Sequence, residues 1–147
     1  MIRRGVLAAG MVGLVLAAAI GVGVVAQEKK PAANPSGWIL PADAAETKNP
    51  HPVDAKLIAT GRSVFKDKCA RCHGAGGLGD GEDADPEIRE DMDLTRAARA
   101  DRNPDGVVYY KVLNGRRKPK MPAFKEELKP DQIWAVVAYV QTLRKKP

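Results

Sequence analysis

The chain has 147 residues, of which 24 are basic and 18 acidic, and its formal net charge is +6. This length suits one domain with a leader, and the small positive charge, without basic stretches interleaved with aromatic residues, excludes a nucleic-acid binder. The charge is unevenly spread, because residues 80–93 carry eight acidic side chains and one arginine, whereas residues 116–120 form a basic cluster.

Residues 1–26 are expected to form a leader. Arg3 and Arg4 precede an uncharged run over residues 5–26, which ends in the small residues of a signal-peptidase site. The run exceeds the usual signal core of about 7–15 residues, and at about 1.5 Å per residue it could cross a membrane core about 30 Å thick. A cleaved signal and a retained membrane anchor therefore both stay open. Either one places the rest of the chain outside the cytoplasm, because the arginines stay inside.

Residues 27–53 form an extension rich in proline and alanine, which predicts extended chain without a helix of its own. Its one apolar patch is Trp38-Ile39-Leu40. We expect this patch to rest on the surface of the domain, with the docking of a partner as the sharper alternative.

Residues 54–147 are expected to form the folded domain. Asp54 is a candidate N-cap for a first helix that ends near Lys68, and the apolar residues of this segment share one helical face. Gly61 in its middle costs about 1 kcal/mol against alanine, which indicates close approach of another helix. The glycines of residues 74–81 predict a loop that continues through the acidic stretch, with a short helix over residues 94–100.

Two further helices are expected in the C-terminal third. One spans Pro104 to Asn114 with Asn103 as its N-cap, and the other begins at Pro130. Lys129 is a poor N-cap, so the start of the last helix is open to a shift. No strand pattern of any length competes, and the predicted fold class is all-α.

The only cysteines of the chain are Cys69 and Cys72, and His73 follows them directly. A disulfide across so short a loop would add little stability, whereas Cys-x-x-Cys-His is the attachment motif of a c-type haem. On one helical turn two thiols can reach the two vinyl groups of one haem, and the adjacent histidine supplies the proximal nitrogen. A structural zinc site needs about four ligands, and besides Cys69, Cys72 and His73 the chain offers only His51 as a further histidine or cysteine. A thioredoxin-like cysteine pair expects a βαβ setting, which the all-α pattern lacks. Both are therefore disfavoured.

A haem used for electron transfer needs a second axial ligand, and the methionines after the leader are Met92 and Met121. Met121 precedes Pro122 in a loop before the last helix, so this loop can fold back across the haem. Met92 lies in the acidic loop and is expected to fill a gap in the packing. Met121 is the predicted ligand, with His51 as a weaker alternative.

On these residues the chain resembles the class I monohaem cytochromes c of the small bacterial type. The similar segments are the first helix around Gly61-Arg62-Ser63-Val64-Phe65, the haem motif, the loop Met121-Pro122-Ala123-Phe124 and the last helix around Trp134 to Val140. The resemblance implies a small helical fold around one covalent haem c, with the last helix crossing the first near its glycine. It also implies a proline carbonyl as acceptor for the proximal histidine, for which Pro86 is the candidate in unusually acidic surroundings.

Ligation by His73 and Met121 would saturate the iron, which predicts a carrier of single electrons and not an enzyme. We expect an exported protein in the periplasm, soluble or tethered to the inner membrane through residues 5–26. Its expected partners are redox proteins: a dehydrogenase, an oxidase or another cytochrome. The alternatives are a haem enzyme or ligand sensor with an open distal site, and a purely structural exported module. Residues 116–120 either meet acidic partners or form a solvated charge run.

Overall fold

The computed structural model describes residues 32–33 and 37–144, so the expected leader lies outside the described residues. The elements in chain order are β1 (Ala32–Ala33), β2 (Ile39–Leu40), α1 (Ala55–Lys68), α2 (Ala70–His73), η1 (Pro86–Ile88), α3 (Arg89–Met92), η2 (Ala97–Arg99), α4 (Asp105–Asn114) and α5 (Pro130–Leu143). The fold is mostly helical, as predicted, and β1 and β2 form only a two-residue antiparallel pairing. Across residues 32–33 and 37–144, none of the helices has the length and apolar character needed to cross a membrane.

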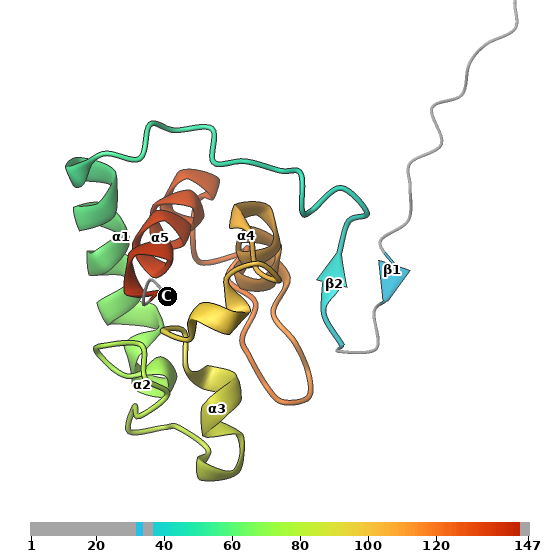
Figure 1. Ribbon diagram of the computed structural model, residues 1–147, viewed down its shortest axis with the longest axis vertical. Helices are drawn as coiled ribbons and strands as arrows, with labels where there is room; N and C mark the ends of the chain where they lie inside the picture. Colours follow the sequence, from blue (N-terminus) through green and yellow to red (C-terminus); the bar gives the residue numbers. More distant parts are fainter. Residues whose placement is uncertain (1–31, 34–36, 145–147) are drawn as a thin grey trace, which may run out of the picture.

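Helices α1 and α5 lie side by side, and α5 lies between α1 and α4 (Figure 1). Asp54 caps α1 as predicted, because its carboxylate accepts a hydrogen bond from the backbone N–H of Leu57 at 2.8 Å. A Cβ atom on Gly61 would lie 1.9 Å from the carbonyl oxygen of Ala135, so only glycine permits this approach. The predicted close approach at Gly61 is therefore confirmed. The residues of α5 from 133 to 140 are all buried.

Helix α4 packs against α5 through the stacked rings of Tyr109 and Trp134, whose centroids are 4.1 Å apart. Its start differs by one residue from the prediction, since Pro104 is the N-cap and Asp105 the first helical residue. Asn103 does not cap the helix, because its side chain donates to the carbonyl of Arg99 and accepts from Lys111.

Helix α5 begins at Pro130, as predicted. The poor capping ability of Lys129 is offset by Gln132, whose side-chain oxygen accepts from the Lys129 backbone N–H at 3.0 Å.

The segment after the glycine-rich loop differs from the prediction on both sides of Leu94. It contains more helix than expected before Leu94 and less helix than expected after it. The acidic stretch contains η1 and α3, whereas the helix expected over residues 94–100 is reduced to the single turn η2. Asp93 explains the loss, because its carboxylate accepts from both the backbone N–H and the hydroxyl of Thr95, at 2.8 and 2.7 Å. These bonds hold a turn at the point where the longer helix would have started.

Residues 37–53 pack onto the helices and run across one end of α4 and α5 before α1 begins (Figure 1). Ala44 is buried, and the carbonyl of Thr47 accepts from the backbone N–H of Gly106 at 3.0 Å. The Asn49 side chain donates to the carbonyl of Trp134 at 3.1 Å. The domain boundary at residue 53 stays a prediction, and these contacts tie its two sides together.

Candidate haem site

A cavity of about 440 Å³ lies among α1, α4, α5 and the segment that joins α3 to α4. Cofactor pockets in proteins commonly have volumes of about 300–1,000 Å³. One part of the wall is apolar and comes from three helices and from the segment after α3: Phe65, Leu94, Val107, Val108, Val112, Val136 and Val140. Cys69, His73 and Met121 line the same cavity. The structure thus brings together three of the four residues that the sequence singled out.

Cys69, Cys72 and His73 share one turn at the junction of α1 and α2, as the haem motif requires. The carbonyl of Cys69 accepts from the backbone N–H groups of Cys72 and His73, at 3.2 and 3.0 Å. Both thiols are free and partly buried. Burial, with Cys72 nearby, raises the pKa of Cys69 to about 12. A redox-active cysteine pair relies on a lowered thiol pKa, so this environment disfavours the thioredoxin-like alternative.

The imidazole of His73 is held by the main chain of α3. Its Nδ1 lies 2.7 Å from the carbonyl oxygen of Met92, and since a carbonyl can only accept, Nδ1 carries the proton. Burial lowers the pKa of His73, against the opposite effect of this hydrogen bond. The ring is therefore neutral at pH 7, with the lone pair on Nε2. Metal-binding histidines commonly donate their other N–H in this way.

The carbonyl expected from Pro86 is supplied instead by Met92, which corrects the sequence-based expectation. Pro86 begins η1, whereas the chain returns to the haem motif only at the end of α3. The return is held by the backbone N–H of Leu94, which donates to the carbonyl of Gly77 at 2.7 Å.

Gly79 brings the glycine-rich loop directly against α3. Its φ is +71°, and a Cβ atom would lie 2.6 Å from the carbonyl oxygen of Arg89. Its backbone N–H donates to the carbonyl of His73 at 2.8 Å. Glycine at this position therefore allows the histidine and its carbonyl acceptor to lie on adjoining segments.

Met121 reaches the cavity because the basic loop closes on itself. Arg116 and Met121 exchange two backbone hydrogen bonds, both of 2.8 Å. Phe124 is buried, and its backbone N–H donates to the carbonyl of Val112 on α4 at 3.1 Å. The predicted loop before the last helix is thus anchored at both sides of Met121.

The weaker ligand candidates do not line this cavity within the described part of the chain. His51 instead lies 3.1 Å from the carboxylate of Asp131 at the start of α5. Met92 contributes its carbonyl oxygen to His73. Cys72, the remaining member of the motif, is half-buried beside the site.

Several residues that the sequence analysis missed form a charged part of the wall. The basic ones are Arg99, Arg102, Lys111, Arg116 and Arg144, and the acidic ones are Asp91 and Asp93. Lys111 was identifiable from helical spacing, because it follows Val107 and Val108 by four and three residues and so shares their face. The other contacts join segments too distant in sequence to show a pattern.

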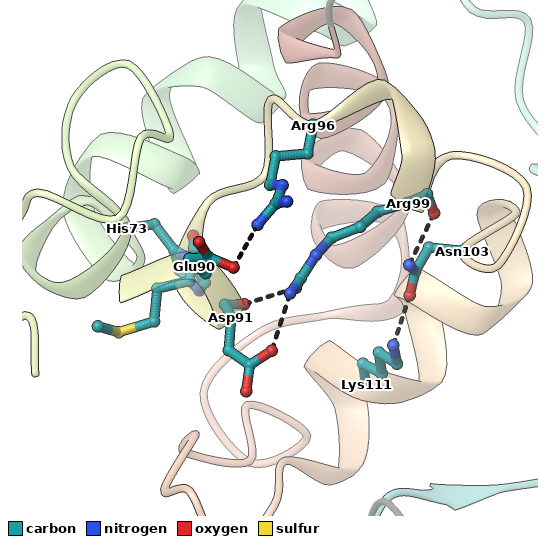
Figure 2. Close-up of polar contacts among 8 residues, drawn as sticks. His73, Glu90, Asp91, Arg96, Arg99, Asn103 and Lys111 are labelled. Atoms are coloured by element: carbon teal, nitrogen blue, oxygen red, sulfur yellow. Dashed lines mark hydrogen bonds and ion pairs between the residues drawn. The ribbon is translucent and has the colours of Figure 1, made fainter. Parts of the chain in front are cut away.

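A chain of polar contacts links this charged wall from α3 to α4 (Figure 2). Arg99 donates to the carboxylate of Asp91 at 2.8 Å, and the Asn103 side chain donates to the carbonyl of Arg99 at 2.8 Å. Lys111 donates in turn to the Asn103 side chain. The network is one of the contacts that hold Lys111 at the cavity.

The lining fits a haem. An apolar wall with sulfur and nitrogen ligands suits the iron and its ring, and a wall with more basic than acidic side chains suits the two haem carboxylates. A cavity lined this way inside a small helical fold defines a cytochrome c domain.

Residues 56–140 match the family described as cytochrome c oxidase, cbb3-type, subunit III, and the chain belongs to this family. It is a monohaem c-type cytochrome domain, a haem-binding module of electron transport. The predicted family and fold class are thereby confirmed.

The chain is similar to three characterised relatives. It is 30% identical over 105 residues to quinohemoprotein alcohol dehydrogenase ADH IIB of Pseudomonas putida, covering 69% of this chain and 14% of the relative. It is 27% identical to the cbb3-type cytochrome c oxidase subunit FixP of Sinorhizobium medicae, covering 94% of this chain and 47% of that subunit. Cytochrome c6 of Cladophora glomerata is 35% identical over 92 residues, which cover 60% of this chain and 90% of the cytochrome. The chain thus spans less than half of the first two relatives.

Among solved structures, a chain of the Kuenenia stuttgartiensis reducing HAO-like protein complex superimposes with a TM-score of 0.52 and 28% sequence identity. The superposition covers 65% of this chain and 47% of that one.

Proposed function

We propose that this protein is an exported carrier of single electrons, with one haem c attached through Cys69 and Cys72 and its iron held between His73 and Met121. The observation that carries the proposal is that His73 and Met121 line one cavity from two different segments. The hydrogen bond from His73 Nδ1 to the carbonyl of Met92 supports the histidine as a ligand, because it leaves Nε2 available.

When bound, the haem supplies an iron whose two oxidation states differ by one electron. The chain contributes ligands and an environment. His73 is oriented by Met92, and Met121 is held by the closed loop that begins at Arg116. If His73 and Met121 both bound the iron, it would have no free coordination site for a substrate or gaseous ligand. This arrangement favours a carrier over a haem enzyme or ligand sensor.

The apolar wall keeps water away from the ring and so limits rearrangement between the oxidation states. Val136 and Val140 of α5 are almost fully buried, as is Phe65 of α1. Because these residues belong to the packed core of α1 and α5, the site is rigid. A rigid site with saturated iron suits electron transfer, in which no bond needs to be made or broken.

We further propose that the protein works outside the cytoplasm and exchanges electrons with a dehydrogenase, an oxidase or another cytochrome. The apolar run of residues 5–26 behind Arg3 and Arg4 supports export. The similarity to an alcohol dehydrogenase and to a cytochrome c oxidase subunit supports these partner classes.

The test compares Met121→Leu with Met92→Leu in protein matured in a host that attaches c-type haem. Each variant replaces one methionine thioether by a leucine side chain. Met92→Leu keeps the backbone carbonyl that accepts the hydrogen bond from His73. We expect haem staining on a denaturing gel for all forms. The methionine-to-iron charge-transfer band should be present in wild type and Met92→Leu and absent in Met121→Leu. A band that survives Met121→Leu, or a five-coordinate high-spin wild type, would overturn the proposal.

A further inference from the structure

Trp38 lies outside the residues that match the family, which begin at residue 56, yet it lines the same cavity as His73 and Met121. It is held there by β2, because the Asn114 side chain of α4 donates to the carbonyl of Ile39 at 2.8 Å. Leu40 of β2 also lines the cavity. The segment before the family domain therefore contributes part of the wall.

The indole ring of Trp38 contacts two of the basic side chains in this wall. The guanidinium carbon of Arg116 lies 4.3 Å from the ring centroid, and the Lys111 ammonium nitrogen lies 5.0 Å from it. An aromatic face attracts cations, and it does so more strongly where water is excluded. Trp38 thus holds a lysine and an arginine from α4 and the basic loop beside one another at the cavity.

The basic side chains that line the cavity differ in their hydrogen-bond and ion-pair partners. Arg99 is paired with Asp91, and Arg144 donates to the carbonyls of Ala100 and Asn103 at 3.1 and 2.7 Å. Lys111 donates to a neutral amide oxygen, that of Asn103. Burial and the surrounding arginines lower the pKa of Lys111 to about 8. The environment of Lys111 therefore disfavours the charged ammonium group. An anion at the cavity would stabilise this charge.

We propose that Lys111 and Arg116, held against Trp38, are the residues that receive the haem carboxylates, so that the segment around Trp38 completes the haem site. The inference rests on the proposed function, because it assumes a haem in the cavity. The chemistry matches, since ammonium and guanidinium groups pair with carboxylates through charge-assisted hydrogen bonds. Asp91 and Asp93 are the acidic groups that face the same cavity.

The inference predicts an effect on the haem's reduction potential. A positive charge beside the haem disfavours the oxidised state, which carries one more positive charge than the reduced state. Without Lys111, a negatively charged haem carboxylate loses its counter-charge and stabilises the oxidised iron. The potential should therefore fall when Lys111 is replaced, and it should also fall when the ring that positions this lysine is removed.

The experiment measures reduction potentials of the haem-loaded full chain by spectroelectrochemistry. For Lys111→Met we expect the equilibrium between the oxidised and reduced forms to shift about tenfold toward the oxidised form, which is about 59 mV for one electron. Trp38→Ala should shift it in the same direction by a smaller factor, and Trp38→Phe by less again. The double variant should change less than the sum of the single variants, because Trp38 acts through Lys111.

Two variants serve as matched controls. Ile39→Ala changes the neighbouring residue of the same strand, whose side chain is 50% exposed. Arg117→Met removes an exposed positive charge next to Arg116. Neither residue lines the cavity, so we expect the reduction potentials of these two variants to stay close to that of wild type. The methionine-to-iron band should persist in every variant, which shows that the iron ligands are intact.

A redox-difference infrared spectrum gives a second, independent readout. The haem carboxylate bands should move in Lys111→Met and stay in place in Arg117→Met. Unchanged potential and unchanged bands in Lys111→Met would overturn the inference while leaving the proposed function intact. A wild-type chain that takes up no haem would overturn both. If Trp38→Ala accumulates poorly, Trp38→Phe and Lys111→Met still decide the question.

Discussion

His73 donates a hydrogen bond from Nδ1 to the carbonyl oxygen of Met92 at 2.7 Å, across 19 positions of sequence. The bond joins the haem motif to the last residue of α3, and no side chain of the acidic stretch takes part in it. It therefore depends on how closely the backbone of the glycine-rich loop lies against α3.

The first prediction concerns Gly79. Replacement by alanine places a Cβ 2.6 Å from the carbonyl oxygen of Arg89 and demands a φ of +71° from a residue that avoids it. We expect the free energy of unfolding to fall by about 1–3 kcal/mol, as for other strained backbone positions. Denaturant titration measures this change.

Gly76→Ala is the control for Gly79 in the same loop, because the nearest atom to its Cβ is 3.8 Å away. The nitrogen resonances of His73 should move in Gly79→Ala and not in Gly76→Ala. Equal stability of the two variants would contradict the explanation.

The second prediction concerns the crossing of α1 and α5. Gly61→Ala would bring a Cβ within 1.9 Å of the Ala135 carbonyl oxygen, so the helices must separate. Overpacking of this kind typically costs about 1–3 kcal/mol, and we expect thermal or denaturant unfolding to show at least that loss. Ser63→Ala on the exposed face of α1 should stay within about 0.5 kcal/mol of wild type. A Gly61→Ala protein as stable as Ser63→Ala would count against the close crossing.

The third prediction is a pH dependence from Asp91. The hydrogen bond from Arg99 lowers the pKa of this carboxyl below 3.8. A group with a lowered folded-state pKa stabilises the fold above its unfolded pKa and loses this contribution as the pH falls through the folded value. Asp91→Asn should therefore be less stable than wild type at pH 7, by no more than about 1 kcal/mol because the pair is partly exposed.

The difference between wild type and Asp91→Asn should shrink once the pH falls below about 3.8 and should vanish in stronger acid. Chemical unfolding at a series of pH values measures it. A difference that grows as the pH falls would reverse the sign and refute the assignment.

The fourth prediction separates the two interpretations of the basic cluster at residues 116–120. Arg117 and Lys120 are exposed, whereas Arg116 lines the cavity, so the first two are the ones able to meet a partner. Oxidation of the reduced protein by ferricyanide, an anion, should slow by a factor on the order of 10 in Arg117→Glu/Lys120→Glu at low salt. The rates of wild type and variant should converge at high salt.

Lys66→Glu, an exposed change on α1, is the control for this charge reversal. A similar slowing in Lys66→Glu would indicate a general charge effect and favour the interpretation as a solvated charge run.

Much of the fold was predictable because its signals are local. The start of α1 at Asp54 and of α5 at Pro130 follows from capping and from proline at the first helical turn. The helix expected at residues 94–100 is shortened to the single turn η2, because Asp93 bonds to Thr95 and holds a turn before it. Asn103 was wrong as a cap for a similar reason, since its side chain bonds to Arg99 and Lys111.

The attachment motif, the helical class and the close approach at Gly61 were predictable from the order of the residues, because adjacency and helical periodicity are properties of the chain. Two contacts became visible only in the folded chain. Met92, and not Pro86, accepts the hydrogen bond from His73, and Trp38 contacts Lys111 and Arg116 at the cavity. These contacts join segments far apart in sequence, and no periodicity encodes them. Their geometry depends on how the glycine-rich loop and β2 pack against the helices.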